Sequence, residues 1–126
     1  MPDIQKTKTT VEQQIRYLQD TLYVINGKWK LPILVAVHEG NTRFRDIQRS
    51  VTGITSKVLS KELKELELNK LVVRKVYDNA PPIVEYTTSN YCDTLQKMIG
   101  EMIDWGKKHH DKIRSEKIDE RLRDIH

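Results

Sequence analysis

The chain has little cysteine and no long apolar stretch. Cys92 is the single cysteine among 126 residues, and because one thiol cannot form an internal disulfide, it fits a reducing compartment. No run of about 18 apolar residues occurs, so we expect no membrane span. Residues 1–6 lack the apolar core of a secretion signal. These absences predict a cytoplasmic protein without a disulfide framework.

Motifs of catalysis and metal binding are also missing. The sequence has no glycine-rich phosphate loop, no nucleophile elbow and no paired carboxylates, so we do not expect an enzyme. His109 and His110, together with Asp111 and Cys92, suggest a metal site at first. Adjacent histidines, however, point about 100° apart on a helix and do not chelate one ion as an i, i+4 pair does. We therefore expect neither a metal ion nor a cofactor.

Charge, in contrast, is plentiful and unevenly distributed. Charged residues make up 32% of the chain, and 22 Lys and Arg against 18 Asp and Glu give a net charge of +4. Residues 43–75 hold nine basic and four acidic side chains, which leaves the remainder of the chain slightly acidic. Such a basic excess in one segment favours an acidic partner such as nucleic acid.

Apolar periodicity predicts the first helices. Between residues 11 and 25, apolar residues recur at steps of three and four, a pattern typical of a helix that packs against another helix. Residues 26–27, Asn-Gly, would end this helix, and residues 1–10 are polar enough to form a frayed arm. Thr42 would cap a short third helix. The second and third helices are expected at about 29–38 and about 43–50.

The fourth predicted helix, at about residues 55–69, begins with Thr55 or Ser56 as its cap and has two different sides. On a helical wheel with about 100° per residue, one side carries three leucines within about 60° of one another, Leu59, Leu63 and Leu66. The opposite side carries Ser60 and three lysines, Lys57, Lys61 and Lys64. The acidic residues lie off the lysine side, namely Glu62, Glu65 and Glu67. The outer face is then basic, although a solvated surface helix with no ligand remains an alternative.

A predicted β-hairpin follows the fourth helix. Residues 71–77 and 83–87 are rich in β-branched and aromatic residues, and residues 78–82 between them favour a turn. A helix followed by a basic hairpin is the layout of a winged helix. The fold class we expect is mainly α with a small β-hairpin wing, with the helix-turn-helix and wing at 43–87 of a single domain that spans residues 1–126.

A long last helix is expected from Ser89 or Asn90 to about residue 125. Its first half has an apolar face that can pack on the domain. Its second half has apolar residues too sparse to bury against one small domain, namely Ile113, Ile118, Leu122 and Ile125.

The basic segment predicts contacts with double-stranded DNA. An α-helix fits the major groove, where its N-terminal residues reach base edges, and lysines and helix N-termini bind phosphate oxygens. A wing would lie along the DNA backbone. The alternative is a winged helix that binds another protein, with hairpin lysines that prevent edge pairing. The candidate DNA-binding residues are Arg43, Arg45, Thr55, Ser56, Lys57, Ser60, Lys61, Lys64, Arg74, Lys75 and Asn79.

Three segments carry a more specific pattern. Residues 25–30 read Ile-Asn-Gly-Lys-Trp-Lys, residues 53–59 read Gly-Ile-Thr-Ser-Lys-Val-Leu, and residues 81–86 read Pro-Pro-Ile-Val-Glu-Tyr. With these segments the sequence closely resembles the HxlR family of bacterial transcriptional regulators, which are winged helix-turn-helix proteins related to MarR. The resemblance extends over residues 15–110 of the chain.

The resemblance implies a homodimer that is held by the first and last helices, at 11–25 and 90–125, and that binds a palindromic operator. Such a dimer presents two recognition helices to successive major grooves, roughly 34 Å apart. We expect a repressor that occludes a promoter rather than an activator. The candidate dimer residues are Val11, Ile15, Leu18, Leu22, Met98, Met102 and Trp105.

Two departures from the family pattern concern signalling. Several relatives carry a Cys-Pro pair in the first helix, whose thiol senses oxidants or electrophiles, whereas the aligned residues here are Arg16 and Tyr17. Cys92 stands where relatives often have glycine, and it is either a substitute sensor or a packed apolar side chain. An unidentified small-molecule effector is a further candidate partner. Four aromatic residues either line its pocket or belong to the core, namely Tyr17, Tyr23, Trp29 and Trp105.

Overall fold

The computed structural model describes residues 8–125 of the chain. The chain forms two compact units, Met1–Ser89 and Asn90–His126. Residues 1–7, which make up most of the predicted N-terminal arm, lie outside the described residues. The single domain expected over residues 1–126 stays a prediction.

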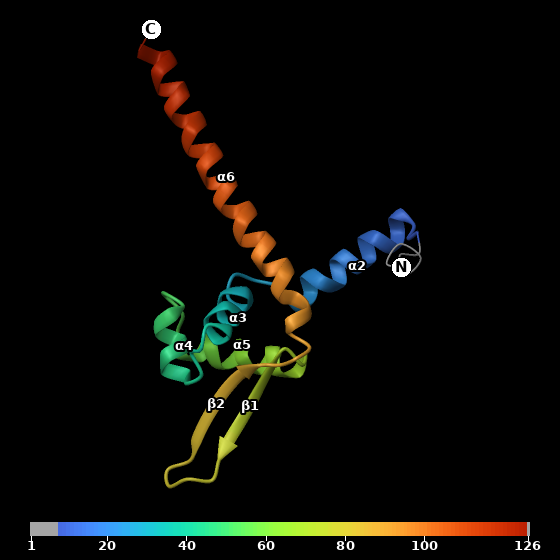
Figure 1. Ribbon diagram of the computed structural model, residues 1–126, viewed down its shortest axis with the longest axis vertical. Coiled ribbons are helices and arrows are strands. Elements are labelled where there is room, and N and C mark those ends of the chain that lie inside the picture. The colour runs from blue at the N-terminus through green and yellow to red at the C-terminus, as the bar shows by residue number, and fades with distance from the viewer. Residues whose placement is uncertain (1–7, 126) are drawn as a thin grey trace. The chain divides into compact units, whose positions relative to one another are not determined.

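The first unit is a winged helix (Figure 1). In its described residues the elements are, in chain order, α2 (Val11–Val24), α3 (Lys30–His38), α4 (Phe44–Ser50), α5 (Ser56–Leu68), β1 (Val72–Tyr77) and β2 (Ile83–Thr88). The two strands pair antiparallel, with Val72 opposite Thr88 and Tyr77 opposite Ile83. The predicted mainly α fold with a β-hairpin wing is therefore confirmed.

The core of this unit lies around α3. This helix contacts α4, α5 and β2, and α5 in turn contacts β1. Because α3 is covered on several sides, its residues are apolar around most of the helix: Ile33 and Leu34 are fully buried, and Ala36 and Val37 nearly so. Pro32 lies in the first turn of α3, where a missing backbone N–H costs no intrahelical bond. α3 thus supplies the platform on which α5 and the hairpin are placed.

A Schellman-type turn connects α5 to the hairpin. The backbone N–H of Leu71 donates to the carbonyl of Leu66, and that of Lys70 to the carbonyl of Glu67, each at 3.0 Å. Lys70 has φ of 65°, in the left-handed region that this turn requires. Leu71 and Val72 are buried, whereas the rest of β1 is exposed. The hairpin therefore starts inside the core and extends from it.

The predicted cap of α4 is wrong. The N-cap residue is Arg43, and no side chain closes this helix end by a hydrogen bond. Thr42 contacts the wing instead: its Oγ1 donates to Glu85 Oε2 at 3.3 Å, and its carbonyl accepts from the backbone N–H of Tyr86 at 2.8 Å. The Thr42 hydroxyl therefore bonds to Glu85 of β2 instead of a backbone N–H of α4. Thr42 thereby joins the segment before α4 to β2.

The start of α2 is a capping box rather than the end of a frayed arm. The Thr10 backbone N–H donates to Gln13 Oε1 at 2.9 Å, and the Gln13 backbone N–H donates to Thr10 Oγ1 at 3.1 Å. The helix ends at the C-cap Ile25, and Gly27 follows with φ of 77°, which glycine adopts without strain. The predicted stop at residues 26–27 is thus confirmed. The predicted arm of residues 1–10 extends too far, because Thr10 is the N-cap of α2.

The second unit consists, in its described residues, of one 33-residue helix, α6 (Asp93–Ile125). The expected start at Ser89 or Asn90 is wrong by three or more residues, because residues 90–92 form a tight turn first. In this turn the backbone N–H of Asp93 donates to Asn90 O, and that of Thr94 to Tyr91 O. None of the described helices is long and apolar enough to cross a membrane.

Candidate nucleic-acid interface

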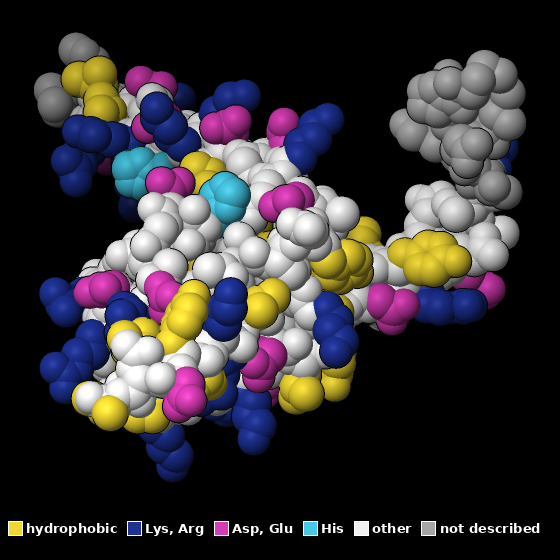
Figure 2. Space-filling model, turned by 60° about the horizontal axis from the view of Figure 1, so that its bottom comes forward, with side chains coloured by type: hydrophobic (Ala, Val, Ile, Leu, Met, Phe, Trp, Pro, Cys, Tyr) yellow, Lys and Arg dark blue, Asp and Glu magenta, His cyan; other side chains and the backbone are white. Residues whose placement is uncertain are grey.

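The two predicted sides of α5 are present in the structure. Leu59 and Leu66 are 0% exposed and Leu63 is 1% exposed, which places the leucine side in the core. The opposite side is open to solvent along its length, at Lys57, Ser60, Lys61 and Lys64. Figure 2 shows lysine and arginine side chains that project along the lower edge of the molecule, with a few acidic side chains among them. α5 is therefore anchored by leucines and presents ammonium groups outward.

Two side-chain hydrogen bonds hold the first turn of α5. Thr55 is the N-cap, and its Oγ1 accepts from the backbone N–H of Val58 at 3.2 Å. Ser56 contacts a residue of α4, because Gln48 Nε2 donates to Ser56 Oγ at 3.1 Å and to the Ile54 carbonyl at 3.3 Å. Gln48 is thus a polar residue at this end of α5 that was not among the predicted residues. The pair spans eight positions across a turn, which no helical periodicity indicates.

An open groove separates α5 from the hairpin. It has a volume of about 330 Å³, and its lining combines Ser60, Leu63, Lys64 and Glu67 of α5 with Arg74 of β1 and Tyr86 of β2. Arg74 and Tyr86 are direct partners across the two strands. Three candidate DNA-binding residues, Ser60, Lys64 and Arg74, are therefore brought together in one groove, although their sequence positions differ by up to 14. Glu67 lies in the same groove, so the outer face is basic with one acidic exception.

The other wing candidates lie elsewhere on the hairpin. Side chains alternate between the two faces of a strand, so Lys75 points away from the groove that Arg74 lines. Its Nζ lies 5.4 Å from the centre of the Tyr77 ring. Asn79 is exposed at the hairpin tip, where its backbone N–H donates to the Tyr77 carbonyl at 2.8 Å. Arg74 and Lys75 thus lie on opposite faces of the wing.

The candidate residues before α5 are also exposed. Arg43 and Arg45 lie at the start of α4 without a partner of opposite charge within 4 Å among the described residues. Arg49, at the other end of α4, forms an exposed ion pair with Asp46 at 3.3 Å. Exposed pairs of this kind contribute little to stability, so these arginines remain free to contact an anion.

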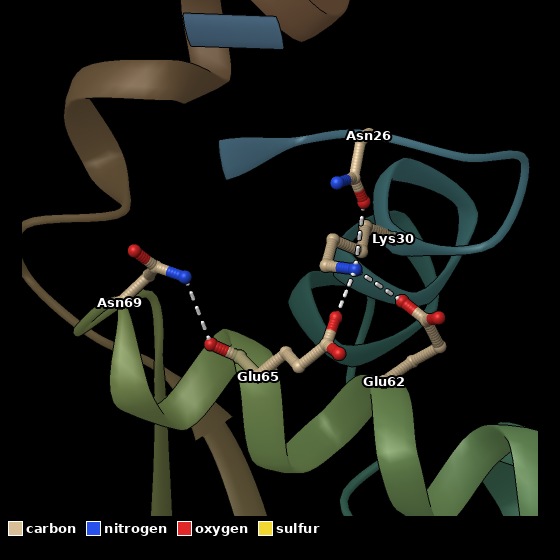
Figure 3. Close-up of polar contacts among 5 residues, drawn as sticks. All are labelled: Asn26, Lys30, Glu62, Glu65 and Asn69. Atoms are coloured by element: carbon tan, nitrogen blue, oxygen red, sulfur yellow. Dashed lines mark hydrogen bonds and ion pairs between the residues drawn. The ribbon is translucent and has the colours of Figure 1, made fainter. Parts of the chain in front are cut away.

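A charged cluster around Lys30, between α3 and α5, is the second feature that was not predicted from the sequence (Figure 3). Lys30, the first residue of α3, is 3% exposed and donates to Glu62 Oε2 at 2.6 Å and to Glu65 Oε2 at 2.5 Å. Burial lowers the pKa of Lys30, but the hydrogen bonds to the two carboxylates outweigh it and leave the pKa above its ordinary value. The same hydrogen bond holds the pKa of Glu65 below its usual range. Two of the three glutamates of α5 are therefore paired with Lys30.

The candidate dimer residues of α2 lie on one uncovered stripe. Val11 is 70% exposed, and Ile15, Leu18 and Leu22 are each more than half exposed. No residue within α2 is buried. An exposed apolar stripe of this length is a surface that can pack against another helix or protein.

α6 carries the remaining candidates. Met102 and Trp105 are exposed, and Met98 is half-buried. The Trp105 ring stacks on His109 with 4.9 Å between ring centres and 11° between planes. The distal Ile113, Ile118 and Leu122 are exposed as expected. The described part of α6 therefore offers apolar side chains along its length.

Cys92 is buried, and burial raises the pKa of its thiol, which keeps it protonated and unreactive near neutral pH. Gln96 Nε2 lies 3.7 Å from its Sγ. Among the described residues, no group of three His, Cys, Asp or Glu side chains is arranged to hold a metal ion. Tyr17 and Tyr23 are exposed and Trp29 is half-buried. The effector pocket expected near these aromatic residues stays a prediction.

Comparison with known proteins decides the family. The sequence profile of the HxlR-like helix-turn-helix family matches residues 24–114, which include the whole of α3 through β2. The chain belongs to this family. An HTH-type transcriptional regulator, YdeP of Bacillus subtilis strain 168, is 38% identical over 96 residues, which are 76% of this chain and 75% of that protein.

Solved structures agree with the family assignment. The HxlR-like chain is similar to the redox regulator HypR in its reduced form, with a TM-score of 0.73 and 36% identity over 78% of this chain and 97% of HypR. A MarR-family regulator from Enterococcus faecalis V583 matches with a TM-score of 0.71 and 33% identity, over 87% of this chain and 98% of that one. The protein is thus a transcriptional regulator with a helix-turn-helix DNA-binding fold, and its relatives are regulators rather than enzymes.

Proposed function

We propose that this HxlR-like protein is a repressor that binds a palindromic operator as a homodimer. The observation that carries the proposal is the exposed lysine side of α5, which shares one groove with Arg74 of the wing. In this arrangement the first turn of α5, with Ser56 and Lys57, enters the major groove and contacts base edges. Lys61, Lys64 and Arg74 contact the phosphates on either side.

Each remaining candidate takes a supporting role in this proposal. Arg43 and Arg45 contact the DNA backbone next to the groove that α5 enters. Lys75 and Asn79 contact the backbone or the minor groove from the wing. Thr55 orients the first turn of α5 through its cap, and Ser60 donates to a phosphate within the groove. Gln48 joins the set through its hydrogen bond to Ser56.

The apolar stripe of α2 supports the proposal of a dimer. Val11, Ile15, Leu18 and Leu22 recur at seven-residue intervals and lie open to solvent, which is the pattern of a helix that pairs with another helix. Met98, Met102 and Trp105 of α6 complete the proposed interface. A twofold dimer places two copies of α5 in successive major grooves and makes the preferred site a palindrome.

The signal that releases DNA is proposed to be a small-molecule effector rather than oxidation of Cys92. HypR is a redox regulator, but in this chain the one thiol is buried and its pKa is raised, so little nucleophilic thiolate is present. An effector that changes the distance between the two α5 helices would relieve repression. If oxidant releases DNA from the wild type and not from Cys92→Ser, this part of the proposal is wrong.

DNA binding is tested by selecting bound duplexes from a random pool with the full-length protein and measuring their affinity by fluorescence anisotropy. We expect a palindromic consensus and specific affinity that Lys61→Ala lowers by about five- to tenfold, as the loss of one charged contact would. Lys117→Ala, which removes the same charge from an exposed site on α6, should leave the affinity unchanged. Equal effects of the two variants, or no selected sequence, would reject the proposed interface.

The dimer is tested by light scattering of the free protein. Leu18→Gln places a polar group in the α2 stripe and should shift the population toward monomer. Arg16→Gln changes a residue on the other side of α2 and should leave the dimer intact. A dimer that tolerates Leu18→Gln at micromolar concentration would exclude the α2 stripe as its interface.

A further inference from the structure

α5 is held in place by two kinds of contact. Its leucine side packs in the core, and such apolar contacts are not directional. They resist separation of α5 from α3 strongly and rotation of α5 about its own axis only weakly. The ammonium group of Lys30 adds hydrogen bonds, which depend steeply on direction. Gln48 holds the first turn of α5 by an exposed hydrogen bond to Ser56, and Lys30 holds the middle of the helix by hydrogen bonds that are largely buried. Lys30 is therefore suited to fix the rotation of α5.

The geometry around Lys30 joins three parts of the fold (Figure 3). Its Nζ donates to Glu62 Oε2 and Glu65 Oε2 on α5, and also to Asn26 Oδ1 at 3.0 Å, which lies in the segment between α2 and α3. The three N–H bonds of the ammonium group are all used. Glu62 and Glu65 are one helical turn apart, so two points along α5 are held from one atom.

A buried ion pair is a poor way to gain stability, because removing both charges from water costs nearly as much as their attraction returns. Well-packed apolar side chains at the same three sites would hold α3 and α5 together as firmly. The feature that apolar residues do not supply is a preferred rotation and register of α5. The cluster is therefore better explained by orientation than by stability.

A small rotation of α5 is enough to affect DNA contact. An α-helix with its side chains is about 10–12 Å across, so a rotation of about 10° moves the outer side-chain ends by about 1 Å. Hydrogen bonds to bases form over a range of about 0.5 Å in length. Lys57, Lys61 and Lys64 lie about 100° around α5 from Glu62 and Glu65 on a helical wheel. A rotation of α5 that the cluster permits therefore moves these three lysines relative to the DNA.

Asn26 extends this connection to α2. Ile25, the C-cap of α2, is buried, and Asn26 follows it directly. We propose that Lys30 is a positioning residue that fixes the orientation of α5 relative to the end of α2, and thereby sets the spacing between half-sites that the dimer accepts. This inference rests on the proposed dimeric operator binding, since α2 carries the proposed dimer stripe.

The experiment uses full-length protein and the duplex that the wild type selects from a random pool. Derivatives of this duplex have one or two base pairs inserted or removed between the half-sites. Affinity is measured on each derivative and on a random duplex for the wild type, Lys30→Met and Glu65→Met. Lys28→Met is the matched control, because Lys28 is an exposed lysine two positions away. Circular dichroism at 25 °C establishes that each variant is folded.

We expect the wild type and Lys28→Met to prefer the selected spacing. In Lys30→Met this preference should fall by about tenfold, the size of coupling found between contacting residues, while affinity for the random duplex and its salt dependence stay unchanged. Glu65→Met removes one acceptor and keeps Asn26 and Glu62, so it should show a smaller loss. A merely structural role would lower affinity for all duplexes alike.

Besides a uniform loss of affinity for all duplexes, three results would overturn the inference. One is a wild-type spacing profile in folded Lys30→Met. If Lys30→Met does not fold, a wild-type profile in folded Glu65→Met has the same meaning. The third is a wild type that selects no duplex at all. This result rejects the proposed function as well, and it differs from the other two because it is seen in the wild type without any variant.

Discussion

Replacing Lys30 by methionine should destabilise the protein far more than replacing any exposed lysine. The change removes an ammonium group that is 3% exposed and leaves the Glu62 side chain, 12% exposed, without its cation. Removal of one partner from a buried ion pair costs about 3–5 kcal/mol, because the remaining charge stays buried. The stability of a domain of ordinary size is about 5–15 kcal/mol. The variant should therefore lose between about a fifth and all of its stability.

The assay is urea unfolding at pH 7, followed by circular dichroism, with Lys28→Met as the matched control. The double variant Lys30→Met/Glu62→Met removes both charges and should recover stability to within about 1 kcal/mol of the wild type. A cycle of the two single variants and the double variant isolates the interaction of the pair. A loss below about 1 kcal/mol in Lys30→Met, or a double variant that is no better than the single one, would refute the assigned burial and pairing.

The pH dependence follows from the two pKa shifts. The pKa of Lys30 is raised, so its stabilisation is complete below the ordinary value of 10.5 and is lost as pH rises through the higher folded value. The pKa of Glu65 is lowered, so its stabilisation is complete above the ordinary value of 4.5 and is lost as pH falls through the lower folded value. The stability difference between the wild type and Lys30→Met should be constant between about pH 5 and 10 and shrink on both sides.

Three further predictions concern α5, α6 and the thiol. Leu63→Ala should cost about 2–5 kcal/mol as a core truncation, whereas Lys61→Ala should change stability by less than about 0.5 kcal/mol, and thermal melts with the opposite ranking would mean that α5 faces the other way. Truncation after His110 should give monomers by light scattering, and a stable dimer would contradict the role of the distal α6. Cys92 should react with a thiol reagent in urea and only slowly in the native protein; fast native labelling would contradict its burial.

The sides of α5 were predictable from the sequence because a helix converts spacing into direction. Leucines at positions 59, 63 and 66 have to face one way, and Lys57, Lys61 and Lys64 then have to face the other way. The hairpin was predictable for a similar reason, since β-branched residues on both sides of a turn specify two paired strands. Local patterns were sufficient wherever one element alone decides the geometry.

Contacts between distant elements were not predictable in this way. Lysine is almost never fully buried, and the partners of Lys30 lie 32 and 35 positions away, so no pattern in residues 25–30 indicates its cluster. Thr42 follows the local rule for a helix cap, but its hydroxyl reaches Glu85 of β2, 43 positions away. The groove that joins Lys64 to Arg74 likewise depends on how the hairpin leaves the core.

The dimer differs from these cases because its partner is another copy. The α2 stripe is exposed in the chain, as an interface helix would be before assembly. Exposure of this kind and the family membership support the homodimer, which stays a proposal until mass is measured in solution.

The salt dependence of operator binding tests most directly whether α5 is the DNA-reading element. The logarithm of the binding constant falls linearly with the logarithm of salt concentration, with a slope of about −0.9 for each phosphate contact. We predict a steep slope for the wild type that becomes shallower by about 0.9 for each of Lys61→Ala and Lys64→Ala, and that Lys117→Ala leaves unchanged. Binding whose slope is the same in all four proteins would show that the basic side of α5 does not contact DNA.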